Sequence, residues 1–239
     1  MTCPADSTTF CNTVIDLKVT SAYNTCMGEV LKLKRGDLRD ALIEYALQAT
    51  KDGHIEVMSL RQAARDLGVS SGAVYRHFAD KDTLLAEIVK IGFFDLRDKF
   101  VAIRPEGAIA KSPTEAIARC RATCRTYIMF AHENNALWHM MFGRVGMACR
   151  DGLMQDPELR RYTPFDVGQE LGRDLHRVGL LNHEPDISDS RYIWSAIHGA
   201  ADLAQSGARL DSGHLDQVIE DTVQRNMRML GINLADIEG

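Results

Sequence analysis

The sequence has few helix breakers, few cysteines and no long apolar run. Only 6 prolines occur among 239 residues, so long stretches of the chain can stay helical. The 6 cysteines are too sparse for a disulfide scaffold and favour a reducing, cytoplasmic setting. No apolar run reaches the ~18 to 20 residues that a membrane-spanning helix needs, and the N-terminal region lacks a secretory pattern. We therefore expect a cytoplasmic protein without a membrane partner.

Motifs of common enzymes are also absent. The sequence contains no Gly-x-Ser-x-Gly, no Gly-rich phosphate-binding loop and no Gly-x-Gly-x-x-Gly. His132-Glu133 begins like a zinc-protease motif, but Ala136 stands where the second histidine is needed. Cys120 and Cys124 have the spacing of two metal ligands on one helix face, yet no third ligand accompanies them, so apolar packing explains them better. The sequence predicts no enzyme, no metal and no cofactor.

The charge is unevenly distributed along the chain. The chain has 28 Lys and Arg against 33 Asp and Glu, a net charge of −5. Residues 1–81 carry equal numbers of acidic and basic side chains, so the acidic excess lies in residues 82–239. Phosphates repel an acidic surface. Any contact with a nucleic acid is therefore expected in the N-terminal part.

Apolar residues recur at helical spacing along most of the chain, and no alternating strand pattern interrupts them. Residues 1–34 are polar and aperiodic, which predicts a poorly ordered N-terminal extension. The expected fold is all-α. Helices are predicted at about 37–52, 59–67, 71–78, 81–103, 113–131, 137–142, 156–179, 189–206 and 214–230.

The segment Ser59–Phe78, SLRQAARDLGVSSGAVYRHF, has the pattern of a helix-turn-helix. Gly68 supplies the turn, and Val74 and Phe78 would attach the second helix to the core. Small residues at the start of that helix would let it approach base edges and phosphates. An ordinary helical hairpin in an all-α core is the alternative interpretation of this pattern.

The stretch Leu60–Leu85 resembles the DNA-binding domain of the tetracycline-repressor-like (TetR) family of transcriptional regulators. The resemblance rests on Ala63-Ala64, Gly68-Val69-Ser70, Gly72-Ala73, Tyr75-Arg76-His77-Phe78, and Lys81 with Leu84. It implies a homodimer that places two recognition helices in successive major grooves of a palindromic, double-stranded operator DNA.

Carried over residue by residue, the resemblance implies three kinds of contact with DNA. The start of the second helix would face the groove, Tyr75 and His77 would contact the backbone or base edges, and Lys81 would bind a phosphate. The alternatives are a half-buried Tyr75, a capping His77 and a solvated Arg76. The predicted DNA-binding residues are Arg61, Ser70, Ser71, Gly72, Ala73, Tyr75, Arg76, His77 and Lys81.

The segment Trp194-Ser195-Ala196-Ile197-His198-Gly199 is similar to an effector-domain subgroup named for its Trp-His-Gly (WHG) signature. The similarity implies a ligand-sensing domain that dimerises, and helices 189–206 and 214–230 are the expected interface. A ligand cavity needs apolar walls and a few polar anchors, although each candidate could equally be a core residue. The candidates for binding a small-molecule effector are Tyr127, Phe130, Trp138, Met141, Phe142, Phe165, Trp194 and His198.

Taken together, these patterns predict a helix-turn-helix DNA-binding domain at 35–95 and an effector-binding and dimerisation domain at 96–239. A long helix, 81–103, would join the two. The predicted function is that of a transcriptional regulator, a repressor released from its operator by a small molecule; an activator has the same sequence features. The competing prediction is an all-α ligand-binding protein or enzyme whose helix-turn-helix is only structural.

Overall fold

The computed structural model describes residues 37–153, 155–205 and 215–238, and these residues contain helices and no strand. The all-α prediction is confirmed. The chain divides into two compact units at Leu84 and Leu85. The predicted extension at 1–34 lies outside the described residues, and the predicted domain ranges 35–95 and 96–239 stay predictions. No helix within the described ranges is both long and apolar enough to cross a membrane.

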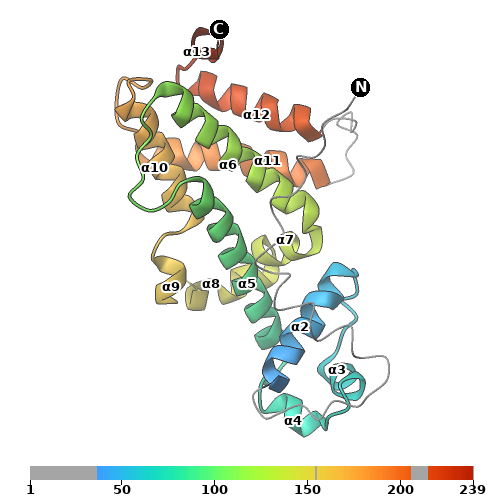
Figure 1. The fold of residues 1–239 in the computed structure, drawn as a ribbon. Coiled ribbons are helices and arrows are strands. Elements are labelled where there is room, and N and C mark those ends of the chain that lie inside the picture. Colours follow the sequence, from blue (N-terminus) through green and yellow to red (C-terminus); the bar gives the residue numbers. More distant parts are fainter. Residues whose placement is uncertain (1–36, 154, 206–214, 239) are drawn as a thin grey trace, which may run out of the picture. The chain divides into compact units, whose positions relative to one another are not determined.

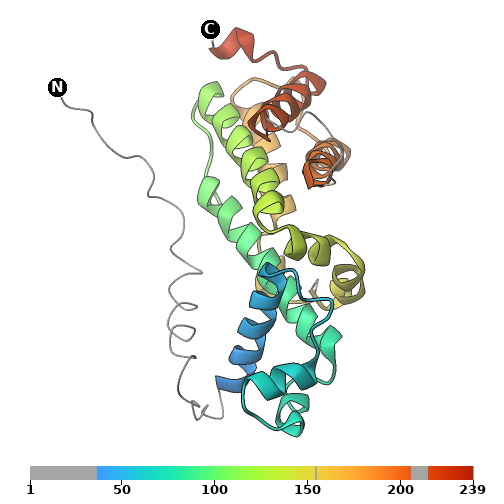
Figure 2. The same ribbon diagram turned by 90° about the vertical axis from the view of Figure 1, so that its right-hand side faces the viewer.

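The first unit is a small helical domain formed by α2 (Asp37–Lys51), α3 (Leu60–Asp66), α4 (Ser71–Tyr75) and the start of α5 (Lys81–Ile103) (Figures 1 and 2). Its core contains apolar side chains from each helix, and α3 packs directly against α4. Gly68, between α3 and α4, has a φ of +66°, a conformation that glycine adopts without steric cost. Its buried core side chains include Leu42, Ala46, Ala64, Val74, Phe78 and Leu84.

Serine side chains cap two helices of this unit. The hydroxyl of Ser59 accepts a hydrogen bond from the backbone N–H of Gln62, which begins α3. The hydroxyl of Ser70 does the same for Ala73 at the start of α4. These caps fix the first turn of both helices of the helix-turn-helix.

The second unit is a bundle in which α6 (Pro113–Glu133) is the central helix. It packs against α7 (Asn135–Phe142), α10 (Pro164–Arg177), α11 (Ile187–Gln205), α12 (Leu215–Met229) and α13 (Ala235–Glu238). Ser112 caps α6, and Pro113 occupies its first turn. In Figure 1, α11 and α12 lie beside α6 at the upper end of this unit. The unit also contains α5 from Leu85 onward, α8 (Arg144–Leu153) and α9 (Pro157–Arg160).

The single helix predicted at 156–179 is wrong, because the structure has two helices there. The helix α9 ends at Arg160, and α10 begins only at Pro164. Thr163 and Asp166 form a reciprocal capping box, and a proline at 164 has no N–H with which to continue the preceding helix. Helices α8 and α13 were not predicted.

Candidate functional site

The helix α4 presents small and polar residues to solvent while one side attaches it to the core. Val74 and Phe78 are fully buried, whereas Ser71 and Gly72 are exposed. A Cβ built on Gly72 would meet no atom within 4 Å, so the helix start is open. Of the other predicted DNA contacts, Arg61, Ser70, Tyr75, Arg76 and His77 are exposed and Ala73 is half-buried.

Tyr75 is 43% exposed, so it is not a core aromatic residue. On the neighbouring helix α3, Asp66 accepts hydrogen bonds from the hydroxyl of Tyr45 and the amide of Gln62, at 2.6 Å each. The carboxylate of Asp66 is therefore hydrogen-bonded to other side chains of the same unit. The structure thus places the predicted DNA-binding residues other than Lys81, which begins α5, on one helix-turn-helix, and their contacts with DNA stay predictions.

Lys81 differs from the expectation that its charge reaches out to a phosphate. Its ammonium group donates hydrogen bonds to the backbone carbonyls of Ile55, at 2.6 Å, and Glu56, at 2.8 Å. Two of its three N–H groups are thus engaged within the protein. Sequence reasoning missed this contact because 26 residues separate Lys81 from Ile55.

In the second unit, five of the eight predicted effector residues form one aromatic cluster. The ring of His198 lies 4.7 Å from Phe142, 5.0 Å from Trp138 and 5.4 Å from Trp194, measured between centroids. Tyr127 meets Trp138 edge-on at 4.9 Å. Such tilted and edge-on pairs are the favoured arrangements of aromatic rings. The cluster joins α6, α7 and α11.

A chain of hydrogen bonds runs through this aromatic cluster. The indole N–H of Trp194 donates to the hydroxyl of Tyr127, which lies 2.9 Å from Nδ1 of His198. Indole only donates, so the Tyr127 oxygen accepts from Trp194 and its hydrogen is available to Nδ1 of His198. In the tautomer that accepts this hydrogen, the ring proton of neutral His198 sits on Nε2. That nitrogen faces Asp202 at 3.7 Å, and Asp202 also accepts a hydrogen bond from Trp138 at 2.7 Å.

Burial shifts the pKa values of His198 and Tyr127 in this series of hydrogen bonds. It lowers the pKa of His198, an effect that the nearby Asp202 carboxylate partly offsets. Burial also raises the pKa of Tyr127 well above its ordinary value, although the hydrogen bond from Trp194 lowers it. Both side chains are therefore neutral near pH 7. Asp202 was missed from the sequence, although its position one helical turn after His198 was an available signal.

The other predicted effector residues lie around or away from this cluster. Phe130 contacts Trp138 with ring centroids 6.5 Å apart. Met141 is buried and its sulfur would lie 2.6 Å from a Cβ built on Gly92 of α5, so it packs on that helix. Phe165, on α10, is half-buried and has no ring contact with the cluster among the described residues.

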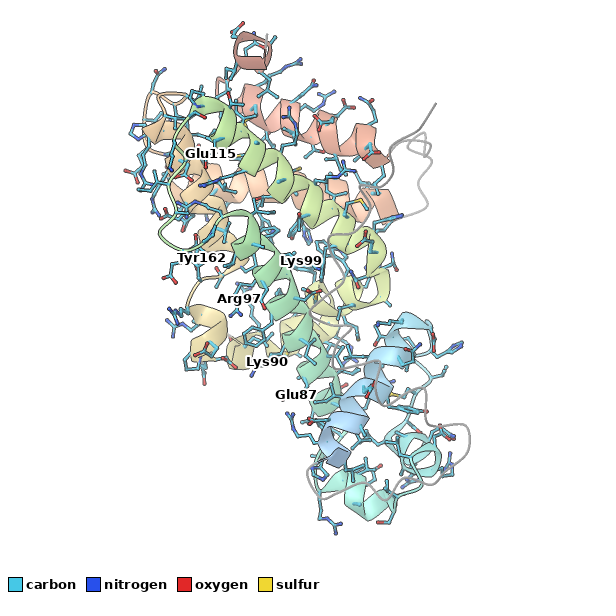
Figure 3. All side chains as sticks on the ribbon, in the orientation of Figure 1. Glu87, Lys90, Arg97, Lys99, Glu115 and Tyr162 are labelled. Carbon is cyan, nitrogen blue, oxygen red and sulfur yellow. The ribbon has the colours of Figure 1, made fainter. Side chains whose placement is uncertain are left out.

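A separate surface cleft of about 200 Å³ lies between α5 and the α9–α10 segment, where Figure 3 labels Arg97 and Tyr162. Its walls include the side chains of Arg97, Val101, Glu158 and Tyr162. None of the predicted effector residues lines it.

Comparison with known proteins gives matches to both units. The family model described as bacterial regulatory proteins, tetR family, matches residues 42–88. A second model, described as tetracyclin repressor-like, C-terminal domain, matches residues 120–230. The chain belongs to the TetR family. The description of the second model does not name the Trp-His-Gly subgroup.

Relatives of this TetR-family chain include curated regulators from mycobacteria. HTH-type transcriptional regulators Rv1816 of Mycobacterium tuberculosis (strain H37Rv) and Mb1846 of Mycobacterium bovis are each 30% identical to it over 114 residues. The match covers 46% of this chain and 47% of theirs, so the chain spans about half the length of the curated relatives it matches.

Solved structures share the fold. A protein of unknown function from Rhodococcus sp. RHA1 superposes with a TM-score of 0.62 at 24% identity, over 81% of this chain and 95% of its own. The fatty acid degradation regulator FadR from Bacillus halodurans gives a TM-score of 0.58 at 15% identity, over 82% of this chain and 97% of its own.

The TetR-family chain also contains a buried ion cluster that its sequence did not reveal. Arg104 is 1% exposed and Asp174 is 0% exposed, and Nε of the arginine lies 2.9 Å from the carboxylate. The other arms of the Arg104 guanidinium donate to the hydroxyl of Tyr162 at 2.8 Å and to Glu170 at 2.9 Å. The cluster therefore ties the end of α5 to α10 and the segment that precedes it.

The two cysteines of α6 have thiols with raised pKa values. Burial raises the pKa of Cys124 to about 12, and the nearby carboxylate of Glu220 adds to the effect. Burial likewise raises the pKa of Cys120 to about 12. Only a thiolate attacks a disulfide or binds a metal, so neither side chain is suited to redox chemistry near pH 7. No group of metal-binding side chains occurs among the described residues.

Cys124 yields a prediction about pH. We expect a thiol reagent to label native Cys124 at pH 8 at least 100-fold more slowly than in the urea-unfolded chain. The thiol pKa of Cys124 is ~8.5 in the unfolded chain and about 12 in the folded chain. The stability that the buried, protonated thiol contributes is therefore full below pH ~8.5 and is lost as the pH rises from there to about 12. Peptide mapping by mass spectrometry gives the labelling rate. Equal rates in native and unfolded chain would contradict the assigned burial.

Proposed function

We propose that the chain is a cytoplasmic, DNA-binding transcriptional regulator, a repressor that a small molecule releases from a palindromic operator. The observation that carries the proposal is the exposed start of α4. Ser71 and Gly72 are accessible and Val74 anchors the helix, so this face is available for a major groove. A helix-turn-helix that is only structural would not need an open, glycine-containing surface there.

The effector is proposed to bind at the aromatic cluster of α6, α7 and α11. Trp194 and His198, the two ring positions of the Trp-His-Gly-type signature, both hydrogen-bond to Tyr127. This shared partner supports assignment of residues 96–239 to that effector-domain subgroup, with 35–95 as the DNA-binding domain. Aromatic walls with a few polar anchors suit a small organic ligand. Phe165 has no ring contact with the cluster and is the weakest of the eight candidates.

The chain is proposed to form a homodimer through α11 and α12. Of the residues of α11, only Ala201 is buried, whereas Tyr192 is 60% and Leu203 is 50% exposed. An exposed apolar helix face is what a second copy would cover. In the dimer, an effector would act by changing the separation of the two recognition helices, which must match about 34–36 Å along DNA.

The interface assignment predicts the effect of one substitution. Ala196 lies on the exposed face of α11, so Ala196→Arg should leave the fold of the chain intact while placing a charge in the interface. We expect a monomer at micromolar concentration and an unchanged helical circular dichroism spectrum. Sedimentation velocity measures the mass. Ala118→Arg, the same change at an exposed position of α6 outside the proposed interface, is the control. A stable dimer of the Ala196→Arg chain would rule out this interface.

Selection of duplexes from a randomised pool by the purified chain tests the function as a whole. We expect enrichment of an inverted repeat whose half-sites are centred about 10 base pairs, or a multiple of that, apart. Recovery of the input distribution after repeated rounds would contradict the proposal and favour a helix-turn-helix with a structural role.

A further inference from the structure

Lys81 connects two segments of the first unit that are distant in sequence. It is the first residue of α5, directly after Asp80, whose carboxylate accepts hydrogen bonds from the backbone N–H and the hydroxyl of Thr83. From this fixed position its ammonium reaches the carbonyls of Ile55 and Glu56 at 2.6 and 2.8 Å. Hydrogen bonds from a charged donor are stronger than those between neutral groups.

The two carbonyls belong to the turn that leads into α3. Within this turn the backbone N–H groups of Val57 and Met58 both donate to the carbonyl of His54, at 3.2 and 3.1 Å. The side chains of Ile55 and Met58 are buried, and the next residue along the chain is the cap of α3. A group that holds residues 55 and 56 therefore also holds the beginning of α3.

We propose that Lys81 is a positioning residue of the DNA-binding unit. It fastens the 54–58 turn, and with it the start of α3, to the start of α5. Because α4 packs against α3, this attachment sets the position of the recognition helix. The inference rests on the proposed function, and it assigns the charge of Lys81 to two backbone carbonyls instead of to a DNA phosphate.

The attachment is tested first in the free chain, without DNA. In Lys81→Met we expect the amides of Val57 and Met58 to exchange hydrogen at least tenfold faster than in the unmodified chain. The amide of Phe78, bonded to the carbonyl of Val74 at 3.1 Å in the same unit, should keep its rate. Lys81→Arg, which keeps a long side chain with charged N–H donors, should retain most of the protection of the Val57 and Met58 amides against exchange.

Two results of this experiment would overturn the inference. Unchanged exchange at Val57 and Met58 would show that Lys81 does not hold the turn. Equal acceleration at Phe78 would show a general loss of stability with no local role for the lysine. Lys51→Met, which removes an exposed lysine of α2, is the control for loss of one positive charge and should leave all three amides unchanged.

The second arm measures affinity for a selected duplex as a function of salt. We expect Lys81→Met to bind at least tenfold more weakly with an unchanged slope of log K against log salt. Arg76→Met, at an exposed position of the same unit, should lower that slope by about 1, the signature of one lost phosphate contact. A slope lowered by about 1 in Lys81→Met would return the residue to phosphate binding. If the unmodified chain binds no duplex, the proposed function fails, and the exchange rates alone decide the attachment.

Discussion

Asp174→Asn should lower the free energy of unfolding of the second unit by about 3–5 kcal/mol. The carboxylate of Asp174 is fully buried and accepts from Arg104 at 2.9 Å, Arg177 at 3.1 Å and Arg119 at 3.4 Å. An asparagine would remove the negative charge that faces three guanidinium groups. Its amide N–H groups would also point at other donors. Since Arg104 is itself buried, its charge would lose its principal partner without gaining water.

Urea unfolding followed by tryptophan fluorescence measures this effect, because both tryptophans, Trp138 and Trp194, lie in the same unit as Asp174. Glu184→Gln is the matched control. Glu184 is 61% exposed and pairs with Arg173 at 3.0 Å, and loss of such a surface pair costs less than about 1 kcal/mol. Similar small losses for both variants would contradict a structural role for the buried cluster.

Gly72→Val should abolish sequence-specific binding without unfolding the chain. A Cβ built at Gly72 meets no atom outside its own helical turn within 4 Å, so a side chain can begin there without displacing a neighbouring group of the free protein. On DNA it would lie at the start of the recognition helix and hold that helix away from the base edges. We expect affinity for the selected duplex to fall at least 100-fold, about 2.7 kcal/mol, with a melting temperature within a few degrees of the original.

Non-specific binding should survive in the same variant, because attraction to phosphates persists when the helix retreats by a few ångströms, whereas base contacts do not. Fluorescence anisotropy on the selected and a scrambled duplex separates the two effects. Gly72→Ala, which adds a single carbon, should have an intermediate effect. Equal losses on both duplexes would mean that α4 does not contact base edges.

Local signals predicted most of the helix boundaries in this chain. Ser59, Ser70 and Ser112 cap helices as their positions indicate, and Gly68 adopts the positive φ expected of a turn glycine. The one helix predicted at 156–179, which is two helices in the structure, was also a matter of local signals. Thr163 and Pro164 repeat the start signal of Ser112 and Pro113, but Asp156 and Pro157 present a similar signal seven residues earlier, and only that first one was used.

Contacts between distant residues could not be predicted in this way. The pair of Arg104 and Asp174 spans 70 residues, and nothing near either residue indicates that its charge is buried. The contact of Lys81 with the 54–58 turn is of the same kind. By contrast, part of the aromatic cluster could be predicted from the sequence, because Trp194 and His198 are one turn apart on one helix. In the structure they share Tyr127 as a hydrogen-bond partner.

The central claim is that two copies of α4 read bases in the major groove. Protection of guanine N7 from methylation by dimethyl sulfate tests it directly, because that atom lies in the major groove. With the unmodified chain on the selected duplex, the account predicts two protected patches related by the inverted repeat and centred about 10 base pairs, or a multiple of that, apart. Gly72→Val should show neither patch at the same concentration. Full methylation at every guanine in the presence of bound, unmodified chain would contradict the account.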